Sequence, residues 1–529
     1  MERRSRSAFD RRGRLRRVFV VAAIPLLLTA GAHRARAETS SQAELLERLK
    51  RLEDNQTKLY ELLKAKDKRL DELEAELKKT KQAPPPAQAA APAPAPTEAP
   101  FTATSSNPAP EGGALPLPDK APGTAEKSLL KTVLGTYEQG RGFGFIRTQW
   151  GDVNFGIYTY VRYLNQKGLE DHLTNGPSKG NKTDKRDDLE LNKVKIEFRG
   201  WLIDPHFRYT LYSWTNNAAQ GLAAQVVLGG NLNWVFGPEL TVGAGILSLP
   251  TTRSTAGNFP NWLGVDHRTA ADEFFRGSYS SGFFAYGASN GFGYYGMLAT
   301  NLSILGVDAG QLDSDFTTAS IAAWWMPTTG EFGPRSGFGD YEWHDDLATR
   351  IGGHFTFSPE NRQSQPGTED IDNTQIRLSN GTVIFSPNAL APNVSVKSVK
   401  YYMGDLDWGV KWHGMALEGE YYLRWLNDFN ADGPLPTHQT FDHGFQVMAS
   451  GMLVPQTLQL YTMGSYIFGD FGDSWETTAG MNWFIFKRKE VRLNVEYLYE
   501  HKSPVGYTAV PQSVGATGSV VDVNVEMSF

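Results

Sequence analysis

The last ten residues constrain the fold of this chain more than any other stretch. They read V-V-D-V-N-V-E-M-S-F from Val520 to Phe529, and from Val521 onward apolar and polar side chains alternate strictly. A period of two is typical of a strand with one apolar and one polar face. A soluble sandwich can end in this way, but a strand that closes a membrane barrel, with its apolar face in lipid, is expected to do so.

The same alternation recurs through residues 141–529. Val194, Ile196 and Phe198, for example, share one face of a segment whose other face is charged. About sixteen such segments can be counted, most of them near the ten residues that a membrane strand needs. We therefore expect an all-β fold, a transmembrane antiparallel β-barrel of about 16 strands. A soluble β-sandwich or propeller is the alternative.

The connections between these segments alternate in length, as expected of a barrel with short periplasmic turns and longer outer loops. Two spacings are exceptions: Pro327 to His344 is too long for its turn position, and Gly469 to Asp473 is too short for a loop. No mature segment has about 18 consecutive apolar residues, so no spanning helix is expected.

Composition narrows the chemistry. The chain has 53 glycines and 12% aromatic residues, which favours a β protein with many turns. It has no cysteine, which excludes disulfides, thiolate zinc sites and thiol nucleophiles. No Ser/His/Asp set is visible, so we predict neither an enzyme nor a cofactor, and no nucleic-acid partner.

The N-terminus is predicted to be a signal peptide spanning residues 1–37. Eight arginines between Arg3 and Arg17 precede an apolar run from Val18 to Ala32, and Ala35-Arg36-Ala37 matches a cleavage site. The alternative is an uncleaved anchor helix.

Residues 38–80 are predicted to form a periplasmic coiled coil, and residues 81–122 an Ala/Pro-rich linker. Leucines, with Gln56 and Lys66 at two positions, recur on alternating steps of four and three among charged residues, which indicates a homo-oligomer. A single solvated helix is the alternative. These leucines are Leu45, Leu49, Leu52, Leu59, Leu63, Leu70, Leu73 and Leu77. The linker composition cannot bury a core and favours an extended spacer.

Two short motifs match cofactor or metal sites only in part. Gly291-x-Gly293-x-x-Gly296 fits a dinucleotide fingerprint, but it lies at a hairpin and opens no helix. The stretch from Asp428 resembles a calcium loop whose twelfth position is Gln439 rather than Glu. Both are interpreted as turns, and no metal site is predicted.

The stretch from Gly245 to Gly287 resembles the phosphate-selective porin O/P family of Gram-negative outer membranes. The shared features are a Gly-containing strand that ends at Pro250, a long loop that carries Arg268, and a Gly-bounded strand after it. The resemblance covers residues 141–529. It implies a sixteen-stranded barrel, a homotrimer in outer-membrane lipid, and a third extracellular loop folded into the pore.

A pore selects by its width and by the charges that line it. On the strand assignment, twelve charged residues are expected to line the pore: Arg162, Lys193, Lys195, Arg199, Arg208, Arg253, Asp266, Arg268, Asp405, Asp407, Glu418 and Glu420. Five basic members, Arg162, Lys193, Lys195, Arg199 and Arg208, gather on the first three strands, and the last four residues form an acidic wall on strands ten and eleven. The 250–272 loop is expected at the constriction.

The expected function is passive diffusion of small hydrophilic solutes across the outer membrane. Residues 141–529 contain 28 basic and 40 acidic residues, a net charge of −12, which favours weak or cation-leaning selectivity. Anions such as phosphate, which the family resemblance implies, remain an open alternative. A different function is a structural tether, in which the coiled coil links the barrel to peptidoglycan.

Overall fold

The computed structural model describes residues 137–138, 142–216, 225–256, 260–302, 316–333, 337–363, 371, 376–506 and 512–529. The predicted signal peptide, coiled coil and linker lie outside these residues. The described strands are β1 (Tyr137–Glu138), β2 (Gly142–Thr148), β3 (Gly151–Leu169), β4 (Asp187–Leu202), β5 (Asp204–Asn216), β6 (Gln225–Gly237), β7 (Leu240–Ser248), β8 (Tyr279–Ser289), β9 (Phe292–Ala299), β10 (Thr318–Trp325), β11 (Ala348–Asn361), β12 (Val396–Trp412), β13 (Met415–Ala431), β14 (Thr440–Val454), β15 (Leu458–Phe468), β16 (Ser474–Trp483), β17 (Val491–His501) and β18 (Gly518–Ser528).

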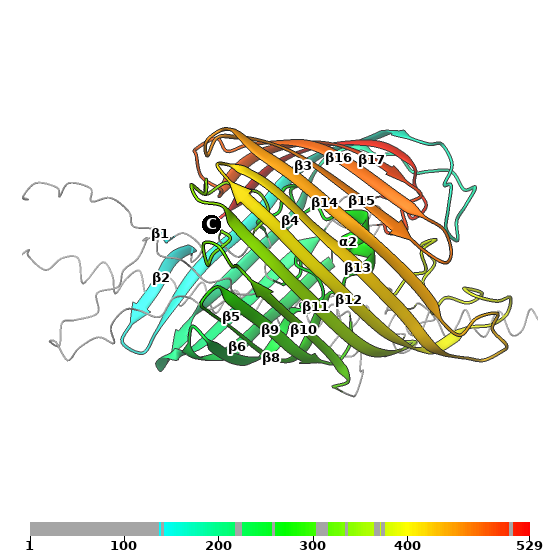
Figure 1. The fold of residues 1–529 in the computed structure, drawn as a ribbon, viewed down its shortest axis with the longest axis horizontal. Helices are drawn as coiled ribbons and strands as arrows, with labels where there is room; N and C mark the ends of the chain where they lie inside the picture. Colours follow the sequence, from blue (N-terminus) through cyan, green and yellow to red (C-terminus); the bar gives the residue numbers. More distant parts are fainter. Residues whose placement is uncertain are drawn as a thin grey trace, which may run out of the picture. The chain divides into compact units, whose positions relative to one another are not determined.

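Sixteen antiparallel strands, β3 to β18, form a closed barrel (Figure 1). Each strand pairs with the next along the chain, and β18 pairs with β3 to close the ring. The predicted all-β barrel of about 16 strands is therefore confirmed.

At the seam that closes the barrel, β2 and β18 share one edge of β3. β18 pairs with the second half of β3, and β2 pairs with the first half. Where β18 ends, Phe529 exchanges two main-chain hydrogen bonds with Ile157, at 2.7 and 2.8 Å. The ring of Phe529 also packs edge-on against Phe143 of β2, at 5.2 Å between centroids. β2 thus takes over the edge of β3 that β18 leaves open.

Side chains alternate between the two faces of the barrel wall, as the period of two predicts. On β12, Leu406 points outward and is 62% exposed, whereas its neighbour Asp407 points inward and is 1% exposed. Large apolar side chains are exposed on the outer face of strand after strand, including Leu211, Leu232, Phe283, Leu298, Ile321, Ile351, Phe355, Leu417, Val447, Tyr497 and Val525. The described barrel is therefore apolar outside, whereas its inner face carries polar and charged side chains together with a buried apolar cluster that includes Phe284, Met297 and Trp324.

Short turns and long loops occupy opposite ends of the barrel. Turns such as 203, 238–239 and 413–414 lie at one end, and loops such as 170–186 and 432–439 lie at the other. The connection between β10 and β11 is long although it belongs to the short-turn end, in agreement with the irregular spacing of the sequence. No helix in the described ranges is both long and apolar enough to cross a membrane.

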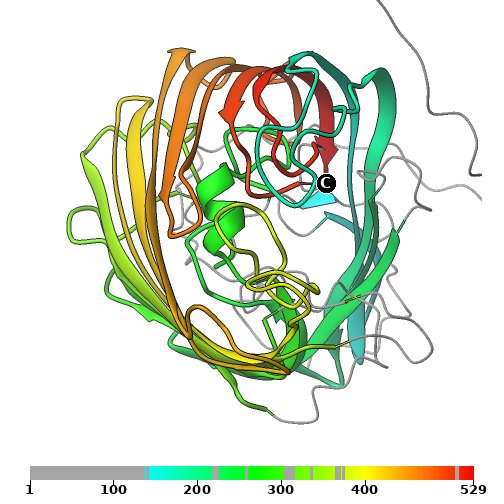
Figure 2. The same cartoon turned by 90° about the vertical axis from the view of Figure 1, so that its right-hand side faces the viewer.

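The third long loop, between β7 and β8, folds into the barrel instead of away from it. We call its described residues, 249–256 and 260–278, the inner loop. It contains the helix α2 (Ala270–Phe275), all six residues of which are buried. The end-on view shows α2 inside the ring, on the side of the yellow and orange strands (Figure 2). Contacts between α2 and β14, β15 and β16 agree with this placement.

Candidate functional site

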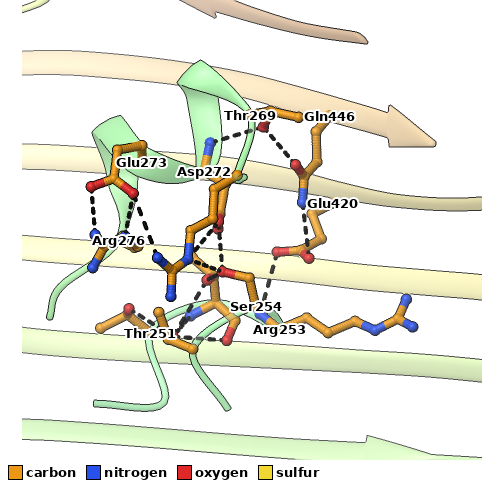
Figure 3. Close-up of polar contacts among 12 residues, drawn as sticks. Thr251, Arg253, Ser254, Thr269, Asp272, Glu273, Arg276, Glu420 and Gln446 are labelled. Carbon is orange, nitrogen blue, oxygen red and sulfur yellow. Dashed lines mark hydrogen bonds and ion pairs between the residues drawn. The ribbon is translucent and has the colours of Figure 1, made fainter. Parts of the chain in front are cut away.

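The helix α2 is held at its N-terminus by polar side chains of the barrel wall (Figure 3). Thr269 caps the helix by accepting a hydrogen bond from the Asp272 amide, and its hydroxyl donates to Gln446 at 2.6 Å. The Ala270 amide donates to the Glu476 carboxylate at 2.9 Å. A carboxylate at this position satisfies a helix N–H that has no partner within the helix and is favoured by the helix dipole.

The C-terminal end of α2 is held by two side chains from β12 and β13. The Tyr401 hydroxyl donates to the Phe275 carbonyl at 2.5 Å, and the Arg424 guanidinium donates to the Phe274 carbonyl at 3.3 Å. The Phe275 ring stacks on Tyr422, with centroids 5.2 Å apart. Polar contacts and ring packing together fix the orientation of the helix.

Arg253 lies in the first part of the inner loop, shortly after β7, and joins it to the acidic wall on β12 and β13. Its guanidinium donates to Glu418 at 2.6 Å, and both side chains are 1% exposed. Its backbone amide donates to Glu420 at 3.3 Å, which Gln446 also contacts at 3.1 Å (Figure 3). An ion pair with this degree of burial depends on both partners, because either charge alone would be desolvated without compensation.

The part of the inner loop that lies nearest the short-turn end of the barrel, residues 262–265, is held by hydrogen bonds to its backbone carbonyl groups. Arg492 on β17 donates to the carbonyls of Trp262 and Leu263, at 2.8 and 3.0 Å. Arg162 on β3 donates to the Val265 carbonyl at 2.8 Å and pairs with Asp522 at 3.1 Å.

His267 lies on the inner loop and contacts Glu496 at 3.1 Å. Burial on its own would lower the pKa of His267, but the carboxylates of Glu496 and Glu476 outweigh it and raise the pKa to about 9. The imidazolium is therefore part of the same polar attachment at neutral pH.

The predicted acidic wall is brought together by the structure, but the inner loop covers it. Asp405, Asp407, Glu418 and Glu420 face the barrel interior and are between 1% and 3% exposed. Asp407 accepts from Arg350 at 2.6 Å and contacts His354 at 3.2 Å. Glu418 and Glu420 are thus bound to the inner loop, and Asp407 to two basic side chains of β11, whereas Asp405 lies 3.7 Å from His354.

The basic residues predicted on β4 lie on the opposite side of the ring and stay partly exposed. Lys193, Lys195 and Arg199 point inward, and their side chains are 12% to 13% exposed. Lys193 pairs with Asp266 of the inner loop at 2.5 Å, and the other two pair with Glu197. Arg208, predicted beside them on β5, is buried, and its Nε donates to the Pro205 carbonyl at 3.1 Å.

Two arginines are the partly exposed residues of the inner loop between 262 and 278. Arg268 and Arg276 are 13% and 12% exposed, and every other residue of that stretch is buried. Arg268 lies over the Trp262 ring at 4.0 Å, and both arginines pair with Glu273. Burial and the nearby charge of Arg276 lower the pKa of Arg268, which nevertheless stays cationic because guanidinium is so strong a base.

Several functional residues of this site were not singled out from the sequence. Arg276 and the side chains that hold the loop, namely Thr269, Gln446, Glu476, Tyr401, Arg424 and Arg492, belong to this group. Alternation places the wall residues inward, but it gives no sign of which ones meet a loop. No group of three or more metal-ligating side chains occurs among the described residues.

Comparison with known proteins yields no match to a family model and none to a curated protein sequence. Solved structures with a similar outline include an outer-membrane OmpT of Vibrio cholerae, at 10% identity and a TM-score of 0.45 over 73% of this chain and 99% of that one. An anion-selective porin of Comamonas acidovorans matches at 12% identity and 0.43, over 72% and 100%. The outer-membrane channel DcaP of Acinetobacter baumannii matches at 9% and 0.44, over 73% and 99%. Likenesses this distant assign no function to the chain.

Proposed function

We propose that this chain is an outer-membrane porin that lets small hydrophilic solutes diffuse passively and favours anions. A closed barrel leaves no unpaired strand edge, and it exposes apolar side chains around its outer face. The hydrocarbon core of a membrane offers backbone groups no water, so only α-helices and closed β-barrels can span it. The short-turn end is then periplasmic, and the long loops face outward.

One observation carries the anion preference. Five basic side chains remain partly exposed at the level of the inner loop: Lys193, Lys195 and Arg199 on the wall and Arg268 and Arg276 on the loop. The partly exposed carboxylates on the inner face of β4, Asp188 and Glu190, are both paired with Arg186. A solute that passes between β4 and the inner loop would meet the five basic groups first.

Net charge points the other way, and burial explains why. The excess of acidic residues gave the expectation of cation-leaning selectivity. The carboxylates of Asp407, Glu418 and Glu420, however, are buried and engaged with arginine, histidine or backbone groups. An anion about 5 Å from one exposed basic group gains roughly 0.8 kcal/mol even at the dielectric constant of water. Exposed charge should therefore govern selectivity more than total charge.

The test is the reversal potential of the purified protein in a planar bilayer under a KCl gradient. We expect stepwise conductance and a potential of the sign that chloride permeation gives, with current reduced by added phosphate. Lys195→Gln should shift the potential toward zero, whereas Lys487→Gln, on an exposed turn, should leave it unchanged. A cation-selective potential would refute the anion preference, and the absence of conductance would refute the channel.

The predicted coiled coil and peptidoglycan tether rest on the leucine repeat and the Pro-rich spacer of residues 38–122, whereas the predicted homotrimer rests on the family resemblance. We propose that this segment acts in the periplasm and is separate from conduction. Deletion of 38–122 should leave single-channel conductance unchanged. A tether would show itself as loss of envelope integrity in cells that carry the deletion, and no such loss would count against it.

A further inference from the structure

The long connection between β10 and β11 folds into the barrel from the short-turn end. We call its described residues, 326–333 and 337–347, the inward turn. Phe332 and Phe338 are buried, and Lys411 on β12 donates to the carbonyls of Phe332 and Gly337, at 2.8 and 2.5 Å. A turn that only joined two strands would need neither this length nor these interior contacts.

The inward turn packs against the arginine that attaches the inner loop. The Arg253 guanidinium lies over the rings of Phe332 and Phe338, at 5.2 and 4.3 Å from their centroids. The Gly339 amide donates to Glu418 at 2.8 Å, the carboxylate that also binds Arg253. One carboxylate thus holds both the inner loop and the inward turn.

The inward turn also contacts the inner loop directly. The Phe338 amide donates to the Asn261 carbonyl at 3.0 Å. The next residue, Trp262, carries the ring on which the Arg268 guanidinium lies at 4.0 Å. A short chain of contacts therefore runs from the turn to a basic side chain that faces the proposed solute path.

Space at this contact is tight. Gly339 has a φ of +75°, which favours glycine, and a Cβ there would lie 2.5 Å from the Gln459 side chain and 3.0 Å from Leu263 of the inner loop. The turn is braced by its own polar contacts, since His344 bonds to Asp340 at 2.5 Å and to Glu331 at 2.9 Å. The inward turn is thus a firm support placed against the inner loop.

We infer that the inward turn is a positioning element of the constriction, which sets the place of Arg268 and so the ion preference of the pore. This inference rests on the proposed porin function. Phe338 and Gly339 are positioning residues that act through Asn261 and Trp262. The specificity-determining charge is Arg268.

A reversible cross-link tests this inference, because the natural chain has no cysteine. The double variant Asn261→Cys/Phe338→Cys removes the Phe338 ring and introduces two thiols at positions whose backbones are hydrogen-bonded at 3.0 Å. A disulfide between them requires Cα atoms about 4.4–6.8 Å apart. The matched control is Thr328→Cys/Thr349→Cys. Its two hydroxyls lie 3.1 Å apart, and it ties the turn to β11 without touching the inner loop.

Reversal potential and amide hydrogen exchange of the 261–268 segment are measured for both pairs, oxidised and reduced. For the loop pair we expect the reduced form to show a potential nearer zero and faster exchange, and oxidation to restore both. The control pair should show no redox dependence. If the loop pair forms its disulfide and neither measurement changes, the inward turn does not position the loop. Redox-dependent exchange in a protein without conductance would refute the porin function and leave the structural coupling standing.

Discussion

The buried ion pair between Arg253 and Glu418 makes a quantitative prediction about the inner loop. In Arg253→Met, the Glu418 carboxylate keeps its hydrogen bond from Gly339 but loses its cation in a site that is 1% exposed. Removing one partner of such a pair costs about 3–5 kcal/mol. The strands keep their own hydrogen bonds, so this cost should fall on attachment of the loop and leave the barrel closed.

Hydrogen exchange of the 250–256 segment measures this cost. At about 1.4 kcal/mol per factor of ten, exchange through loop opening should accelerate by roughly two to three and a half orders of magnitude. The double variant Arg253→Met/Glu418→Gln removes both charges and keeps an acceptor for the Gly339 amide, so most of the protection should return, because neutral replacement of a buried pair is often tolerated. Protection in Arg253→Met equal to that of the natural protein would refute the clamp, and failure of the double variant to recover would show that the charges are not its basis.

Arg268→Gln should lower the chloride-to-potassium permeability ratio about fourfold, which is the equivalent of roughly 0.8 kcal/mol for an anion about 5 Å from the lost charge. The control variant Arg488→Gln, on an exposed turn, should leave the ratio unchanged. Equal permeability ratios for the two variants would contradict the role of Arg268. Burial would lower the pKa of His344, but its two carboxylate partners raise it from 6.5 to about 9. Protonated His344 should therefore support the inward turn fully below about pH 6.5 and lose this contribution as the pH rises through 9, so open-channel current noise should grow over that range; a flat profile would count against it. Deleting Phe529 removes the paired hydrogen bonds to Ile157, so the fraction of folded, heat-resistant protein on gels should fall. Phe529→Leu keeps the backbone groups and should keep this fraction unchanged. If the two variants give the same heat-resistant fraction, these hydrogen bonds are dispensable.

The barrel itself could be predicted from the sequence because the features that indicate it lie within short, continuous stretches of the chain. Alternation along each strand, strand length and the order of short and long connections need no knowledge of distant contacts. The irregular spacing from Pro327 to His344 was visible as well, although its destination was not. Strict alternation fails where the backbone is irregular. Asn192 and Lys193 are consecutive on β4, yet both point inward, because the register between β3 and β4 shifts at Tyr160 and Val161.

The division of charges inside the barrel could not be predicted in the same way. Alternation shows that Glu418 and Lys195 both point inward. It cannot show that the inner loop lies on the first and leaves the second partly exposed, because that depends on contacts such as Arg253 with Glu418, which are 165 positions apart. On the proposed anion preference, net charge is a poor guide for the same reason, since it also counts carboxylates that are buried inside the barrel.

The seam between β18 and β3 has a consequence for biogenesis. Arg162 on β3 donates to Asn524 on β18, and these residues are 362 positions apart. Before β18 (Gly518–Ser528) is made, the edge of β3 that it later occupies is therefore unpaired. Open edges recruit strands from other chains, and pairings over such separations form slowly. If the chain is exported to the outer membrane as proposed, we expect the precursor to need a chaperone that covers this edge, and a chain truncated before Gly518 should be degraded rather than form a smaller pore.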